Sequence, residues 1–77
     1  MTTELVVLRA ADDAALVAEM SRLVGFLDRV PDVRLVDVAY TCSLSRGPSA
    51  IAIIADGVPS LRARLVSARS RIAAGST

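Results

Sequence analysis

Apolar residues gather along the chain in five segments, and their spacing predicts two short strands and three helices. Continuous apolar runs over 4–10 and 50–55, each bounded by polar residues, indicate buried strands. Between them, apolar residues three and four positions apart predict an amphipathic helix over about 13–30. The same spacing predicts a shorter helix over about 35–45 and a last helix that begins near Pro59.

Polar and turn-forming residues mark the ends of these segments. Asp12 is a candidate N-cap of the first long helix, and Pro31 disfavours helical backbone in the residue before it. Gly47 can take the left-handed cap conformation that ends the second helix, and Pro48 prevents its continuation. Residues 71–77 are expected to form a frayed tail.

The order strand, helix, helix, strand, helix predicts a single small α+β domain over residues 1–77. We expect a sheet of two or three strands packed by helices. Two strands make a thin sheet, and isolated strand pairs are marginally stable. An uncovered edge or face is therefore expected, which favours association with a partner or with another copy of the chain.

The composition limits where the protein can act. The 77 residues are 53% hydrophobic but only 3% aromatic, so the core must be built from aliphatic side chains. No apolar run approaches the roughly 18 residues needed to cross a bilayer. The first residues lack a basic leader and a signal-peptide core. We expect a cytoplasmic protein with no membrane partner.

The reactive side chains lack a partner that would activate them. The chain has one cysteine, Cys42, and no histidine, which excludes an internal disulfide, the familiar hydrolase triads and histidine zinc sites. Thr41, Ser43 and Ser45 stand near Cys42, but no general base accompanies them. Cys42 shares an apolar stripe with Val38 and is expected to pack as a small hydrophobe. We therefore expect no catalysis, no cofactor and no metal.

Charge is distributed unevenly although the net charge is +1. All eight acidic residues lie in 1–56, whereas 57–77 has no acid and contains Arg62, Arg64, Arg69 and Arg71. With one Phe and one Tyr in the chain, there are too few aromatic residues for stacking on nucleic acid bases. We expect no nucleic acid partner; a protein-facing arginine patch that includes Arg62 and Arg69 is the better interpretation.

The order of several motifs along the chain is similar to that of a known family. "DVAYT" (37–41) follows a "PD" turn (31–32) at the right distance from the opening "ELVVLRAADD" (4–13). With the later "AIAIIADGVPSLRARL" (50–65), this order resembles the linker domain between ketosynthase and acyltransferase in modular type I polyketide synthases. The resemblance covers nearly the whole chain.

The resemblance implies a small α/β linker domain that does no chemistry and offers docking surface to catalytic domains. Carried onto this sequence, it makes Asp37, Tyr40, Thr41 and Arg46 the candidate partner-binding residues. The expected partners are a ketosynthase, an acyltransferase or both. If the 77 residues are the whole protein, these partners are reached in trans.

Two other functions stay open from the residues alone. A small ligand-binding or regulatory α/β domain would dimerise through its sheet edge and show a discrete pocket. An accessory enzyme that uses Cys42 is the weaker alternative.

Overall fold

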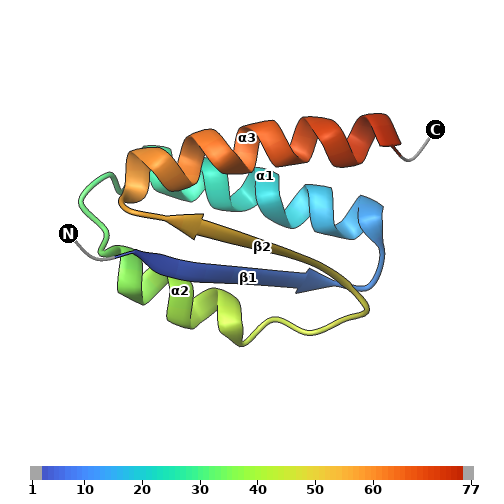
Figure 1. The fold of residues 1–77 in the computed structure, drawn as a ribbon, viewed down its shortest axis with the longest axis horizontal. Helices are drawn as coiled ribbons and strands as arrows, with labels where there is room; N and C mark the ends of the chain where they lie inside the picture. Colours follow the sequence, from blue (N-terminus) through green and yellow to red (C-terminus); the bar gives the residue numbers. More distant parts are fainter. Residues whose placement is uncertain (1–2, 76–77) are drawn as a thin grey trace.

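The fold is a two-stranded antiparallel sheet with three helices, in the order that the sequence predicts (Figure 1). The computed structural model describes residues 3–75. Its elements are β1 (Glu4–Ala10), α1 (Asp13–Arg29), α2 (Leu35–Ser43), β2 (Ser49–Ala55) and α3 (Val58–Gly75). The α+β class is confirmed, and the sheet formed by the described residues has two strands.

β1 and β2 pair along their whole length, with Glu4 opposite Ala55 and Ala10 opposite Ser49. Successive side chains of a strand point to opposite faces of the sheet. The inward-facing side chains are Val6, Leu8, Ala10, Ile51, Ile53 and Ala55. The prediction that both strands are wholly buried is wrong, because α1 and α3 both lie on one face of the sheet (Figure 1).

α1 and α3 pack side by side on this inner face and supply most of the core (Figure 1). Met20, Leu61 and Leu65 are completely buried where the two helices meet the sheet. α1 begins as predicted, because the Asp12 carboxylate accepts a hydrogen bond of 2.8 Å from the backbone N–H of Ala15. The buried side chains of the core include no aromatic residue, as the composition requires.

α2 lies along the edge of β1 that β2 does not occupy (Figure 1). Val38 and Cys42, one helical turn apart, are buried against the core. In the loop that follows, the Ser45 hydroxyl accepts a hydrogen bond of 2.9 Å from the backbone N–H of Arg9 and donates one to the carbonyl of Cys42. This edge of the sheet is therefore covered by the chain itself.

The chain passes from α2 to β2 through Gly47, whose φ is 142°. α2 ends at Ser43, with Leu44 at its C-cap, so Gly47 is not the helix cap that the sequence predicts. It lies instead against the last residue of β1, and a Cβ built on it would be 2.0 Å from the carbonyl oxygen of Ala10. The positive φ and this close approach both require glycine.

α3 continues to Gly75, so helix is found over most of the range 71–77 in which the sequence predicts a frayed tail. Ile72 is half-buried and packs on the core, and the two alanines after it are strong helix formers. These contacts extend the helix; residues 76–77 lie outside the described part of the chain.

The helices are short, or interrupted by charge. α3, the longest, has 18 residues, and four of them are arginines. Across residues 3–75, none combines the length and the apolar character that crossing a membrane requires.

Candidate docking surface

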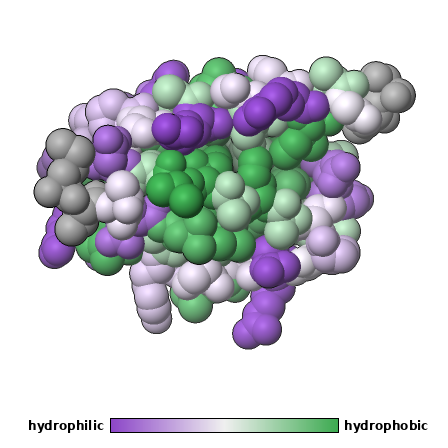
Figure 2. All heavy atoms as spheres, in the orientation of Figure 1, coloured by the Kyte–Doolittle hydropathy of each residue, from purple (hydrophilic) through white to green (hydrophobic). Residues whose placement is uncertain are grey.

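The face of the sheet turned away from α1 and α3 is apolar and open to solvent. We call its apolar part the apolar sheet face, which consists of Leu5, Val7, Ala50, Ala52 and Ile54; Arg9, opposite Ala50, lies on the same side of the sheet. Leu5 and Ile54 lie opposite each other in the ladder and are 56% and 63% exposed. Figure 2 shows a hydrophobic area over the two strands, bordered by hydrophilic side chains. Such patches mark sites of protein association.

The apolar sheet face follows from strand sequences that are apolar on both faces. A strand with one wet face usually alternates apolar and polar residues, whereas 4–10 and 50–55 are almost continuously apolar. The long helices cover only one side of the strands, so the second set of apolar side chains stays uncovered. Sequence reasoning anticipated an open face but identified none of its residues; the continuous runs were the available signal.

The residues carried over from the linker resemblance do not form one cluster. Asp37 and Thr41, four positions apart, lie on the side of α2 that faces α1. Tyr40 lies on another side of the helix and is 68% exposed, one turn from the exposed Val36. Arg46 is exposed in the loop after α2. The helix therefore presents two separate surfaces.

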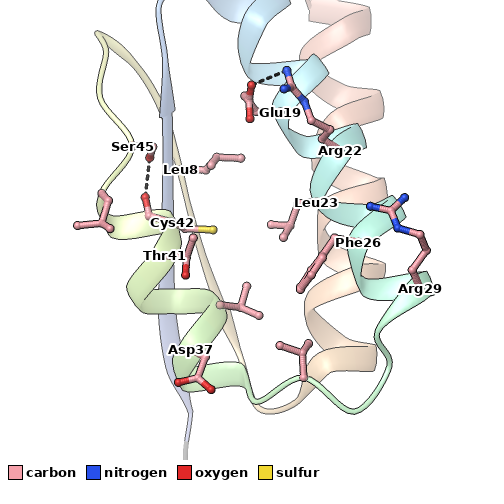
Figure 3. A pocket seen from close by; sticks show the side chains of 13 residues that line it. Leu8, Glu19, Arg22, Leu23, Phe26, Arg29, Asp37, Thr41, Cys42 and Ser45 are labelled. Carbon is pink, nitrogen blue, oxygen red and sulfur yellow. Dashed lines mark hydrogen bonds and ion pairs between the residues drawn. The ribbon is translucent and has the colours of Figure 1, made fainter.

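A groove of about 750 Å³ runs between α1 and α2 (Figure 3). Leu23 and Phe26 project from α1 towards Thr41 and Cys42 on α2. Asp37 lies at one end, and an ion pair of 2.7 Å between Glu19 and Arg22 lies towards the other (Figure 3). The lining is mainly apolar, so the groove suits a hydrophobic occupant.

Cys42 points into this groove but is poorly placed for nucleophilic chemistry. The residue is 7% exposed, and burial raises the pKa of the thiol above its ordinary value. The thiolate is the reactive form, so a raised pKa lowers reactivity. The hydroxyls of Ser43 and Ser45 donate to backbone carbonyls of α2. These are structural roles at the helix end.

We expect native Cys42 to react with a thiol-specific disulfide reagent at pH 8 at least about tenfold more slowly than in the unfolded chain. Burial and the raised pKa both reduce the concentration of accessible thiolate. Stopped-flow absorbance with and without denaturant measures the ratio. A native rate equal to or above the unfolded rate would contradict the structural role of Cys42.

Two of the predicted partner-binding arginines hold α3 against α1. Arg62 donates to both carboxylate oxygens of Asp28, at 2.6 and 3.2 Å, and these hydrogen bonds hold the pKa of Asp28 below its ordinary value. Arg69 donates to the Ser21 hydroxyl at 3.2 Å. Both arginines therefore have internal contacts, which leaves less of their hydrogen-bonding capacity for a partner.

Within residues 3–75, no three His, Cys, Asp or Glu side chains lie close enough together to hold a metal ion. No model of a known protein family matches the chain. Among the described residues, the apolar sheet face is the surface best suited to binding another protein.

Proposed function

We propose that the chain is a non-catalytic docking module of a polyketide synthase system that binds a ketosynthase domain, an acyltransferase domain or both. The observation that carries the proposal is the apolar sheet face, where Leu5 and Ile54 are exposed side by side. The resemblance of "DVAYT" (37–41) and its preceding "PD" turn to the linker between those domains supplies the class of partner.

The energetics of the sheet favour a covering partner. A two-stranded sheet needs cover to be stable, and here only its inner face has helices. Burying one exposed Leu or Ile side chain contributes roughly 1.5–3 kcal/mol. A protein surface laid on the apolar sheet face would supply the missing layer, as in other layered domains.

In the proposal, the polar residues of the resemblance add contacts outside the apolar sheet face, from α2 and from the loop after it. Tyr40 offers an exposed ring with a polar tip, the kind of side chain that dominates protein interfaces. Arg46 and Asp37 are exposed charges that can set the orientation of a partner. Thr41 lies one turn after Asp37 on α2, at the wall of the groove between α1 and α2.

Replacing both Leu5 and Ile54 with serine tests the proposal. We expect the wild-type chain to bind purified ketosynthase or acyltransferase domains of its own pathway, and the double variant to bind about 100-fold more weakly. The loss of two buried aliphatic contacts is the reason. Isothermal titration calorimetry measures both affinities, and circular dichroism verifies that the variant is folded.

Val30→Ser is the matched control, because Val30 is also an exposed aliphatic residue but lies at the end of α1. Its affinity should stay close to that of the wild type. If the wild-type chain binds no ketosynthase and no acyltransferase of its pathway, the proposal is wrong. If Val30→Ser weakened binding as much as the double variant, the interface would not lie on the apolar sheet face.

A second candidate function, a small ligand-binding or regulatory domain, is supported by the groove between α1 and α2. Its volume of about 750 Å³ lies within the roughly 300–1,000 Å³ typical of small-molecule sites. In that case at least one metabolite in a thermal-shift screen should raise the melting temperature of the protein, and sedimentation should show a dimer. Absence of both, with binding to synthase domains, would exclude it.

A further inference from the structure

The two edges of the sheet differ in what covers them. The outer edge of β1 is closed by α2 and by the hydrogen bond from Arg9 to Ser45. In the part of the chain that the structure describes, no third strand pairs with the outer edge of β2. Its sequence, "SAIAIIA" over Ser49–Ala55, has neither the proline nor the lysine that commonly protects an edge strand.

The ladder identifies which backbone groups of β2 point outward. The N–H of Arg9 points away from β2, because it donates to Ser45 on the α2 side. In an antiparallel ladder, residues alternate between pointing towards the partner strand and pointing away from it. Arg9 lies opposite Ala50, so Ala50, Ala52 and Ile54 present their N–H and C=O groups at the open edge.

α3 lies past the outer edge of β2 (Figure 1), and a groove separates the helix from the strand. Packed helices are about 8–10 Å apart and strands about 4.8 Å apart, so two helices are as wide as about four strands. On the β2 side a groove of about 330 Å³ lies between the strand and α3. Arg64, Ser67 and Arg71 line its helix wall, three to four residues apart on one face of α3.

The groove wall carries positive charge that no ion pair within residues 3–75 neutralises. The ion pairs among the described residues join Arg22 to Glu19 and Arg62 to Asp28, so neither includes Arg64 or Arg71. The guanidinium of Arg64 donates a hydrogen bond of 3.4 Å to the Ser60 hydroxyl. The hydrophilic border of the apolar area in Figure 2 lies along α3, next to β2.

We propose that the open edge of β2 binds an extended acidic segment of a partner protein as an added strand. The segment pairs with the backbone of Ala50, Ala52 and Ile54, and its inward-facing carboxylates contact Arg64 and Arg71. Side chains on one face of a strand are about 7 Å apart for neighbours and about 14 Å apart for next neighbours. Arg64 and Arg71 are roughly 10 Å apart along α3, between these two spacings, so two carboxylates of the segment can reach them.

Charge selects this occupant over a second copy of the chain. If two copies paired through β2, each would bring its own Arg64 and Arg71 to the joined sheet, and these like charges would repel across it. A strand with acidic residues at alternate positions removes that repulsion. The proposal does not require the partner to be a synthase domain, so it can stand or fall apart from the docking function.

The test uses the full chain and two synthetic ten-residue peptides, one alternating Glu with Val and one alternating Gln with Val. We expect the Glu peptide to bind, measured by fluorescence anisotropy, and the Gln peptide to bind about tenfold more weakly. Arg64→Gln combined with Arg71→Gln should bring the Glu peptide to the same weak affinity. Arg29→Gln combined with Arg34→Gln removes two exposed arginines elsewhere and should change little.

Ala52→Pro tests the backbone pairing. It deletes an N–H that points outward, so the ladder to β1 is retained while the added strand loses its central donor. We expect at least a tenfold loss of peptide affinity, whereas Ala52→Thr, which keeps the N–H, should bind like the wild type. Hydrogen exchange gives a second readout: the amides of Ala50, Ala52 and Ile54 should gain protection when the Glu peptide binds.

Three results would overturn the proposal. One is the absence of Glu peptide binding at millimolar concentration. Another is binding that Ala52→Pro leaves unchanged. The third is concentration-dependent protection of the β2 edge amides without peptide, together with a dimer by sedimentation, which would make a second copy the occupant.

Discussion

Gly47→Ala is expected to lower the free energy of unfolding by about 2–5 kcal/mol, because it adds backbone strain at a positive φ and a steric clash. The new methyl group would lie 2.0 Å from the carbonyl oxygen of Ala10, so either the end of β1 or the turn into β2 must move. A 77-residue domain has a total stability of about 4–12 kcal/mol. Urea unfolding followed by circular dichroism measures the loss.

Gly25→Ala is the matched control for this substitution. Gly25 lies inside α1, and a Cβ there would meet only the flexible end of Arg29, at 3.5 Å. Alanine should therefore stabilise the helix by about 0.5–1 kcal/mol. If both alanines had the same effect, the special role of Gly47 would be wrong.

Leu65→Ala is expected to destabilise the fold by about 2–5 kcal/mol through the loss of buried methyl groups and the cavity they leave. Leu65 is completely buried in the core, which in so small a domain has few other side chains to compensate. Thermal unfolding by differential scanning calorimetry should show a markedly lower melting temperature for the variant.

Leu44→Ala removes the same atoms at an exposed position. Leu44 is 60% exposed at the end of α2, so its truncation should change stability by less than about 1 kcal/mol. Similar losses at Leu65 and Leu44 would mean that the core does not lie where α3 meets the sheet.

The sequence predicted the elements well because their signals are local. The three- and four-residue spacing of Leu16, Met20, Leu23, Val24 and Leu27 can only be satisfied by a helix with one buried side, and α1 has that arrangement. Gly47 was misassigned because a proline follows it and a helix precedes it. Its actual constraint comes from Ala10, 37 residues earlier, and no local pattern contains that contact.

The candidate surface was harder to predict than the fold. The "DVAYT" motif placed Asp37, Tyr40 and Thr41 in one group, but a helix turns about 100° per residue and separates neighbours onto different sides. The spacing alone could have paired Asp37 with Thr41 and Val36 with Tyr40. Whether a continuous apolar strand is covered on one face or two depends on how many helices reach it, which is a tertiary property.

The pairing of β1 with β2 has a consequence for how the protein is made. Each rung of the ladder joins residues far apart in the chain, from Ala10 with Ser49 to Glu4 with Ala55. Translation proceeds at about 5–20 residues per second, so β1 is synthesised seconds before its partner strand. Leu61 and Leu65, which close the core, are added later still. Until these residues are added, β1 and the apolar stripe of α1 lack their native partners, and any part of them outside the ribosome is accessible to chaperones that bind such segments.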